Sequence, residues 1–232
     1  MKKDRVFYKA FQTSLPVMAG YVVLGTGFGM VLKAAGYGVG LALAMSVFIF
    51  AGSMQFVAVN LMTGGASLLT TAVTTLLVNA RHLFYGISMI ERYQDTGAKK
   101  PYLIFSLTDE TYSLLSTDPR LMPREKEERH RFYFLVSLLN QSYWVTGCVT
   151  GSLLGGILPI DSTGIDFSLT ALFLTIVVDQ WRSGKHHLPT VLGLIISAAC
   201  LVIFGPDRFL IPAMLAILAA VYAIRGREEA HG

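Results

Sequence analysis

Charge is scarce in this chain of 232 residues: Asp, Glu, Lys and Arg make up 15% of it, and hydrophobic residues make up 53%. A soluble domain usually carries about 25% charged residues. A helix needs about 20 apolar residues to cross a hydrocarbon core of about 30 Å. The sequence therefore predicts an integral membrane protein, surrounded by a lipid bilayer, with six or more spans. The runs without any acidic, basic or histidine residue are 10–32, 34–80, 132–160, 188–206 and 209–224.

Motifs of several enzyme classes are also absent. The chain has no Walker-type Gly-rich loop followed by Lys and Ser or Thr, no H-E-x-x-H and no G-x-S-x-G stretch. Its two cysteines, Cys148 and Cys200, lie apart in apolar segments, which favours packing over a disulfide or a metal site. We therefore expect no enzyme, no cofactor and no metal. The net charge of +4 lies at span ends, so no nucleic-acid partner is expected either.

The fold class expected is an all-α polytopic membrane protein of about seven or eight helical segments, some of them broken or re-entrant, forming a single transport domain over residues 1–232. Residues 101–117 are mostly apolar but reach only about 25 Å as a helix, so they form either a short span or a re-entrant piece. The other predicted segments are 15–32, 40–62, 68–90, 132–158, 167–180, 189–204 and 209–224.

Basic residues orient these spans. They mark the amino terminus, a charged loop at 118–131, the turn 182–185 and the tail 225–227. We place the loop, the turn and the tail in the cytoplasm. The amino terminus lies on the same side if 101–117 crosses the membrane; if it does not, the two halves are inverted relative to each other. The apolar run after the amino terminus continues into further spans, which favours a retained helix in an inner-membrane, multi-pass protein over a cleaved signal peptide.

A weak internal repeat relates two possible halves, 10–117 and 132–225. Tyr21 precedes one Gly-rich helix and Tyr143 another, and each is followed by an amide beside an aromatic residue, Gln55 with Phe56 and Gln180 with Trp181. Duplication of this kind is common in secondary transporters. Chance similarity between apolar segments is the alternative.

Three glycines, Gly25, Gly27 and Gly29, interrupt the first predicted span. Gly25 and Gly29 have the i, i+4 spacing of close helix packing. The alternative is an unwound turn that exposes backbone donors and acceptors to a substrate. In the second span, Gln55 follows Gly52 and Ser53, which could loosen the helix locally; Gln55 either bridges two helices or faces a substrate.

The end of the third span carries the most informative cluster. Helical spacing places Asn79, His82 and Gly86 on one face, with Arg81 and Tyr85 at i and i+4 beside it. Arg81 lies roughly 13 Å from the predicted end of the span. Snorkelling to the membrane surface explains Arg81 alone, but not Asn79 and His82 together. Such a cluster could hold a carboxylate through Arg81, while His82 titrates near neutral pH.

Acidic residues form the fourth group: Asp109 and Glu110 in the segment 101–117, and Asp179. Acids within a membrane suit proton coupling or pairing with an ammonium group. Structural alternatives are a helix cap for Asp109 and an interfacial position for Asp179. Polar and aromatic lining is added by Asn140, Gln141 and Trp144. The substrate-binding candidates are thus Gly25, Gly27, Gln55, Asn79, Arg81, His82, Tyr85, Asn140, Gln141 and Trp144; the proton-coupling candidates are Asp109, Glu110 and Asp179.

Four stretches together resemble the AzlC family: Ser-Leu-Pro at 14–16, Phe-Ala-Gly-Ser-Met-Gln-Phe at 50–56, Asn-Ala-Arg-His-Leu-Phe-Tyr-Gly at 79–86, and Leu-Thr-Asp-Glu at 107–110. Their order and spacing carry the resemblance. Many relatives have Asp where this chain has Asn79, which removes one acid that could partner Arg81.

The resemblance implies a membrane exporter subunit for valine, leucine, isoleucine and similar amino acids, coupled to protons and working with a small membrane partner of the AzlD type. A zwitterion needs donors for its carboxylate, for which Arg81 and His82 are candidates, and acceptors for its ammonium group, for which Asp109, Glu110 or Gln55 could serve. The alternatives are a secondary transporter of another small organic solute and a structural subunit of a transport complex.

Overall fold

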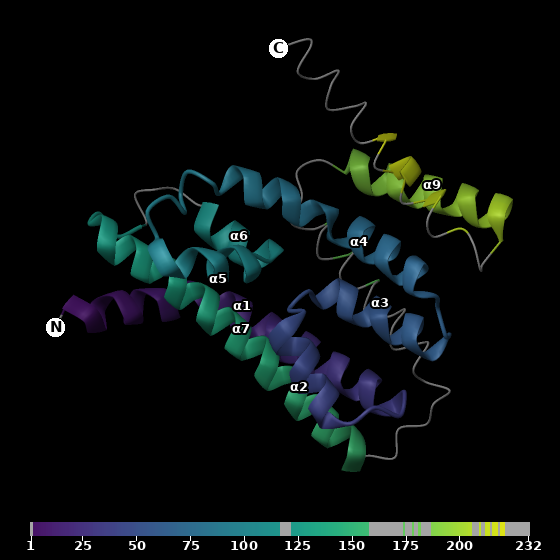
Figure 1. The fold of residues 1–232 in the computed structure, drawn as a ribbon, viewed down its shortest axis with the longest axis horizontal. Coiled ribbons are helices and arrows are strands. Elements are labelled where there is room, and N and C mark those ends of the chain that lie inside the picture. Colours follow the sequence, from purple (N-terminus) through teal and green to yellow (C-terminus); the bar gives the residue numbers. More distant parts are fainter. Residues whose placement is uncertain are drawn as a thin grey trace, which may run out of the picture. The chain divides into compact units, whose positions relative to one another are not determined.

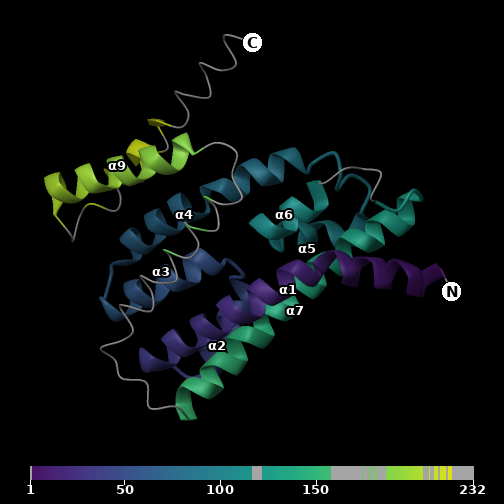
Figure 2. The same cartoon turned by 180° about the vertical axis from the view of Figure 1, so that it is seen from behind.

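All regular structure in the described part of the chain is helical (Figures 1 and 2). The computed structural model describes residues 2–116, 122–157 and 187–205, with scattered residues in 174–181 and 209–220. The chain forms two compact units, residues 1–66 with 78–168 and residues 67–77 with 169–232. The one-domain organisation with halves at 10–117 and 132–225 stays a prediction, as do the internal repeat and the number of membrane crossings.

Two long helices, α1 (Lys2–Ala34) and α7 (Lys126–Ile157), lie side by side in the first unit (Figures 1 and 2). Their backbones touch through glycine. A Cβ at Gly29 would lie 2.1 Å from the carbonyl oxygen of Cys148, and a Cβ at Gly151 would lie 2.0 Å from that of Thr26. Because α1 is continuous through its glycines, the packing interpretation is confirmed there and the unwound turn is wrong.

The predicted second span is not one helix. It is divided into α2 (Val39–Phe48) and α3 (Gly52–Thr63), and the chain turns between them at Phe50, whose φ is +43°. Positive φ is uncommon for a bulky residue and does not continue a right-handed helix. Helices of 10 and 12 residues reach only about 15–18 Å, so neither crosses the hydrocarbon core alone.

Helix α4 (Leu68–Ser88) agrees with the predicted third span, although its first half belongs to the second unit and its second half to the first. The segment predicted at 101–117 is interrupted like the second span. After the short 3-10 helix η1 (Gly97–Lys99) come α5 (Lys100–Phe105) and α6 (Asp109–Ser116). Since α6 has eight residues, the segment does not cross a bilayer as a single helix.

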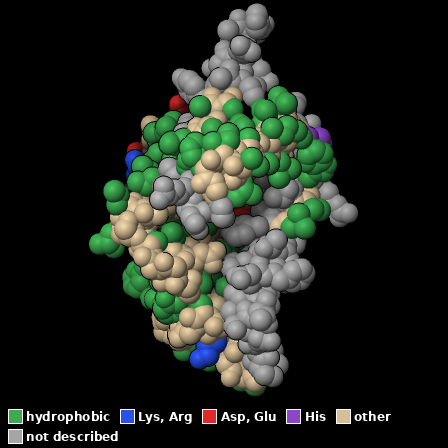
Figure 3. Space-filling model, turned by 90° about the vertical axis from the view of Figure 1, so that its right-hand side faces the viewer, with side chains coloured by type: hydrophobic (Ala, Val, Ile, Leu, Met, Phe, Trp, Pro, Cys, Tyr) green, Lys and Arg blue, Asp and Glu red, His purple; other side chains and the backbone are tan. Residues whose placement is uncertain are grey.

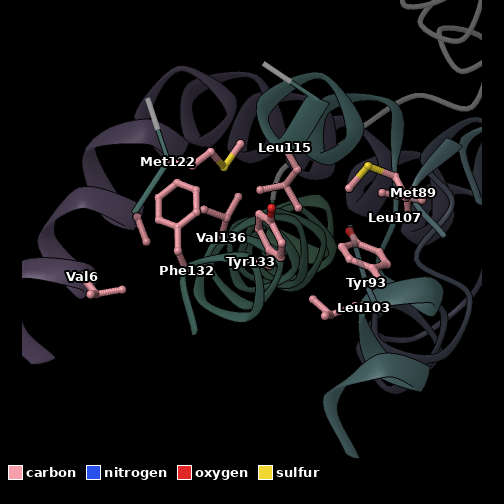
Figure 4. Packing of buried hydrophobic residues seen from close by; sticks show 11 residues of the cluster. Val6, Met89, Tyr93, Leu103, Leu107, Leu115, Met122, Phe132, Tyr133 and Val136 are labelled. Atoms are coloured by element: carbon pink, nitrogen blue, oxygen red, sulfur yellow. The ribbon is translucent and has the colours of Figure 1, made fainter. Parts of the chain in front are cut away.

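Buried hydrophobic side chains hold α5 and α6 against the first half of α7 (Figure 4). Leu103 of α5, Leu107 of the connection and Leu115 of α6 meet Tyr133 and Val136 of α7, and all five are 4% exposed or less. Met89, Tyr93, Phe132, Val6, Ala10 and Met122 complete this cluster. The packing fixes α6 although it is too short to be stable alone.

The second unit contains the first half of α4 and helix α9 (Leu188–Phe204), which agrees with the predicted span at 189–204. Large apolar side chains point outward on both, such as Leu68, which is 90% exposed, and Val202, which is 85% exposed. The described side chains in the view of Figure 3 are mostly hydrophobic or uncharged. The predicted turn 182–185 and tail 225–227 lie outside the described residues, as do most of the predicted span 167–180 and half of the predicted span 209–224.

One stretch among the described residues, Asp4–Ala34, is both long and apolar enough to cross a membrane. Shorter apolar helical stretches are Val39–Phe48, Leu68–Val78 and Thr190–Phe204. The outward-facing apolar side chains agree with a hydrocarbon environment, because monomeric soluble proteins rarely expose so many in one region.

Candidate functional site

Arg81 of α4 connects the two interrupted segments through an ion pair and a hydrogen bond. Arg81, from the second half of α4, places Nη1 2.5 Å from Oδ2 of Asp109 in the first turn of α6. Its Nη2 donates a hydrogen bond of 2.5 Å to Oγ of Ser53 in the first turn of α3. One guanidinium therefore connects the starts of both short helices. The side chains of Arg81 and Asp109 are 36% and 31% exposed, so a small molecule can reach them.

The helix starts explain why the pair forms where it does. Thr108 caps α6, since its Oγ1 accepts a hydrogen bond of 3.3 Å from the backbone N–H of Thr111. Asp109 then stands in the first turn, where the helix dipole favours a negative charge. Ala51, at the start of α3, makes no side-chain cap, and the hydroxyl of Ser53 in that turn is bound to Arg81 instead.

Tyr21 of α1 contacts both places where a predicted span is interrupted, the turn between α2 and α3 and the start of α6. Its hydroxyl donates to Oε2 of Glu110 at 2.6 Å and lies 2.6 Å from Oγ1 of Thr108. Its ring packs edge-on against Phe50, with centroids 6.3 Å apart, and against Trp144, with centroids 5.5 Å apart. Tyr21 thus couples Glu110 to the turn between α2 and α3.

Helix α7 supplies the polar wall of the site. Trp144 Nε1 donates a hydrogen bond of 2.8 Å to Oε1 of Gln55. Asn140, one turn earlier, donates through Nδ2 to Oγ1 of Thr111 at 3.0 Å. Gln141 donates to the carbonyl oxygen of Val47 at 3.0 Å, one of the carbonyls that the end of α2 leaves without a helical partner.

Several buried polar atoms of this cluster form no hydrogen bond with the described residues. Two are donors, Nε of Arg81 and Nε2 of Gln55, and three are acceptors, Oδ1 of Asp109, Oδ1 of Asn140 and Oδ1 of Asn79. Buried polar groups are almost always satisfied, so a concentration of unsatisfied ones calls for an explanation. A ligand that carries both donors and acceptors could satisfy both kinds of unpaired atom.

Two predicted residues of α4 lie at the edge of the cluster. Tyr85 is close enough to Asp109 to interact with it electrostatically, and its ring stacks on Tyr112 with centroids 4.5 Å apart. His82 is half-buried, and its Nδ1 lies 3.2 Å from the backbone oxygen of Asn79 within the same helix. Its ring meets Tyr85 edge-on, at 6.2 Å between centroids.

The structure thus brings most of the predicted site residues together: Gln55, Arg81, Tyr85, Asp109, Glu110, Asn140 and Trp144 lie in one connected network, with Gln141, Asn79 and His82 beside it. Gly25 packs against α7, where a Cβ would lie 2.9 Å from the carbonyl oxygen of Trp144. Gly27 has open space beside it. Asp179 lies outside the described residues.

Four further residues belong to the network although the sequence did not indicate them as site residues: Tyr21, Ser53, Thr108 and Thr111. The role of Thr108 as a helix cap could have been predicted, because a threonine followed by two acids is a typical helix start. The role of Tyr21 could not have been predicted, since an aromatic residue in an apolar run usually packs in the core.

A separate pocket of about 470 Å³ lies between the segment after α4 and the start of α7. Its lining is Glu91, Arg92, Gln94, Asp95, Met122, Lys126, Arg129, His130 and Tyr133. Nζ of Lys126 lies 2.6 Å from Oδ2 of Asp95, and this hydrogen bond, with the lysine charge, lowers the pKa of Asp95. Partial burial and the nearby charges of Lys126 and Arg129 lower the pKa of His130.

Interrupted helices with apolar outer faces around a partly exposed charge pair are typical of a helical membrane protein with a polar site. Residues 16–158 match the AzlC protein family. The chain is 42% identical to the branched-chain amino acid transport protein AzlC of Bacillus subtilis, over 94% of this chain and 85% of that protein. The chain therefore belongs to the AzlC family.

Other relatives are described as membrane proteins without a stated function. An uncharacterized membrane protein of Helicobacter pylori is 38% identical over 97% of both chains. The inner membrane protein YgaZ of Escherichia coli is 28% identical over 93% of this chain and 86% of its own length. No solved structure is significantly similar to this chain.

Proposed function

We propose that this chain is the transporting subunit of an exporter of branched-chain amino acids in the inner membrane, which it crosses several times. The observation that carries the proposal is the Arg81–Asp109 pair, set among buried donors and acceptors that lack partners. The name of the Bacillus subtilis relative, a branched-chain amino acid transport protein, supports this choice of substrate.

In the proposed mode of binding, the α-carboxylate of the amino acid accepts hydrogen bonds from Nε of Arg81 and Nε2 of Gln55. Its ammonium group donates to Oδ1 of Asp109 and Oδ1 of Asn140. These four atoms are buried without partners in the described structure, so the ligand satisfies groups that are otherwise costly to bury. Apolar and aromatic neighbours such as Phe50 would face the aliphatic side chain.

Export against a gradient needs an energy source, and we propose the proton gradient. Glu110 accepts a hydrogen bond from the hydroxyl of Tyr21 beside the proposed substrate site. Among the described acids it is the one best placed to take up and release the coupling proton. Asp109 and Asp179 are the other candidates from the sequence. We further propose that a small membrane subunit of the AzlD type completes the exporter.

The test is leucine transport by the chain reconstituted with its small subunit in liposomes under an imposed pH gradient. We expect Arg81→Gln and Asp109→Asn to lower leucine efflux at least about tenfold, which corresponds to about 1.4 kcal/mol. The exposed Arg124→Gln is the matched control and should transport normally. Normal efflux by both site variants, at equal protein in the membrane, would contradict the assignment.

A further inference from the structure

The pocket of about 470 Å³ beside the start of α7 contains none of the residues of the proposed transport site, and one side of it is basic. One face of α7 lines it with side chains spaced i, i+3, i+4 and i+7: Lys126, Arg129, His130 and Tyr133. The acids in the first turn of α7, Glu127 and Glu128, are not part of the lining. Helix α7 therefore presents a basic face to the pocket.

The acids of the lining do not neutralise this face. They are Glu91 and Asp95, and Asp95 is already paired with Lys126, whose Nζ lies 2.6 Å from its Oδ2. Arg129 and His130 are half-buried, and neither side chain has a hydrogen-bond or ion-pair partner among the described residues. Two nitrogen-bearing groups on adjacent residues are thus left for a ligand.

The basic groups of the pocket also act on one another. Partial burial and the charges of Lys126, Arg129 and Lys99 lower the pKa of His130, and the charge of Asp95 opposes this shift. An anion placed between these groups relieves their mutual repulsion. A ligand with several acceptor oxygens can accept hydrogen bonds from a guanidinium and an imidazole at once.

Arg92 adds a second guanidinium to the lining. It donates to the carbonyl oxygens of Leu115 and Ser116 at the end of α6, and these two bonds fix its position. A guanidinium has more N–H groups than two carbonyls use, and its planar fork suits the oxygens of a phosphate. A side chain that is already held in place loses less conformational freedom when a ligand binds.

The pocket lies where α7 passes from a charged segment into an apolar one. The run without charged or histidine residues begins at Phe132, directly after the basic side chains of the lining. Met122 and Tyr133 supply apolar surface to the pocket and belong to the buried cluster of Figure 4. Basic pockets at the border of the hydrocarbon region are typical places for the headgroup of an anionic lipid.

We propose that this pocket binds a phosphate group through Arg129, His130 and Arg92. The phosphate belongs either to the headgroup of an anionic phospholipid or to a small soluble phosphate ester, because both present the same oxygens. The proposal goes beyond the proposed function, since it concerns a separate site and does not depend on which substrate is transported.

The experiment titrates the purified full chain in neutral detergent with three separate probes: labelled phosphatidylglycerol, labelled phosphatidylcholine with the same acyl chains, and glycerol 1-phosphate. We expect phosphatidylglycerol to bind at least about fivefold more tightly than phosphatidylcholine, whose choline cation meets the same basic side chains. Binding of the lipid without binding of glycerol 1-phosphate identifies a lipid headgroup as the ligand. The reverse result identifies a soluble phosphate ester, and binding of both supports the shared chemistry.

Variants test the pocket in both directions. Arg129→Gln should weaken the binding of either ligand at least about fivefold, the usual contribution of one basic residue beside an anionic lipid. Arg124→Gln, an exposed residue outside the lining, should leave the affinity unchanged. Asp95→Asn frees Lys126 from its ion pair and should strengthen binding, and asparagine suits the φ of +62° at this position.

A gain of affinity in Asp95→Asn cannot result from misfolding, so this variant separates a binding role from a structural one. Binding of neither phosphatidylglycerol nor glycerol 1-phosphate would overturn the proposal. Equal affinity in the wild-type protein and in Arg129→Gln, or weaker binding by Asp95→Asn, would overturn it as well. Because these assays measure binding without transport, their failure leaves the proposed function standing.

Discussion

The indole nitrogen of Trp144 donates a hydrogen bond of 2.8 Å to the side-chain oxygen of Gln55, which lies 89 residues earlier in the chain. Because an indole N–H can only donate, the amide of Gln55 must present its oxygen to it. The nitrogen of the amide is then the end that faces away, buried and without a partner among the described residues. One tryptophan thus determines that Gln55 offers a donor to the site.

Replacing Trp144 by Phe removes the indole donor and keeps an aromatic ring. The amide of Gln55 can then turn over, so we expect the apparent affinity for leucine to fall about tenfold, as for the loss of a bond worth about 1–2 kcal/mol. Concentration dependence of leucine efflux measures this. Trp181→Phe is the control, because Trp181 is 43% exposed. Unchanged affinity in the Trp144 variant would show that the orientation of Gln55 is irrelevant to substrate.

The contact between α1 and α7 can be tested with alanine at three glycines. At Gly29 and Gly151 the new Cβ would lie 2.1 Å and 2.0 Å from a carbonyl oxygen of the other helix. We expect Gly29→Ala and Gly151→Ala each to lose about 3 kcal/mol of stability or more, because backbone cannot move aside as a side chain can. The melting temperature of the purified protein measures the loss.

Gly27→Ala is the matched control on the same helix, since no atom lies within 4 Å of its Cβ position. Alanine is the better helix former, so its melting temperature should be equal or slightly higher. If Gly27→Ala transports leucine normally, Gly27 is not needed for substrate. Equal destabilisation by all three changes would contradict the close packing of α1 and α7.

Tyr21→Phe keeps the ring against Phe50 and Trp144 but removes the hydroxyl that contacts Glu110 and Thr108. We expect leucine efflux to fall several-fold while the stability changes by only about 1 kcal/mol, the usual effect of one hydrogen bond. Initial rates of efflux under a fixed pH gradient, together with melting curves, separate the two effects. Tyr8→Phe serves as the control, because Tyr8 is 62% exposed. Efflux at the wild-type rate by Tyr21→Phe would show that the hydrogen bond between Tyr21 and Glu110 has no role in transport.

Arg92 binds the carboxyl-terminal end of α6. Its guanidinium donates to the carbonyl oxygens of Leu115 and Ser116, the last residues of α6, the second of them at 3.2 Å. Arg92→Gln leaves these carbonyls unpaired at the end of a short helix, so we expect a lower melting temperature and reduced leucine efflux, although Arg92 touches no site residue. Arg92→Lys should recover only part of both, because an ammonium group lacks the planar fork. Normal leucine efflux by Arg92→Gln, as expected for the control Arg124→Gln, would show that the carbonyl oxygens at the end of α6 need no partner.

The sequence predicted the membrane class and most members of the site because charged and amide groups stand out in apolar runs. Arg81, Asp109 and Glu110 could be identified without a structure, since each is costly in hydrocarbon unless it has a partner. Which partner each has could not be predicted. Asp109 binds Arg81 and Glu110 binds Tyr21, a choice that depends on how α1, α4 and α6 meet.

The interruptions of the helices were harder to locate. At Gly25 and Gly29 the sequence left two interpretations open, close packing and an unwound turn, and these two residues pack α1 against α7. The second span was expected to loosen at Gly52 and Ser53, but the turn lies just before them at Phe50, a residue whose type does not favour positive φ. Its buried ring packs against Tyr21, so tertiary contacts, which no local pattern reveals, override the local preference there.

The neutrality of the Arg81–Asp109 pair has an electrical consequence. A zwitterion that exchanges partners with a neutral pair brings no net charge into the site and removes none. A membrane potential of 100 mV does about 2.3 kcal/mol of work on each elementary charge that crosses, and it does no net work on a zwitterion. All voltage dependence of leucine efflux must then come from the coupling ion, and its steepness gives the number of charges that move with each leucine.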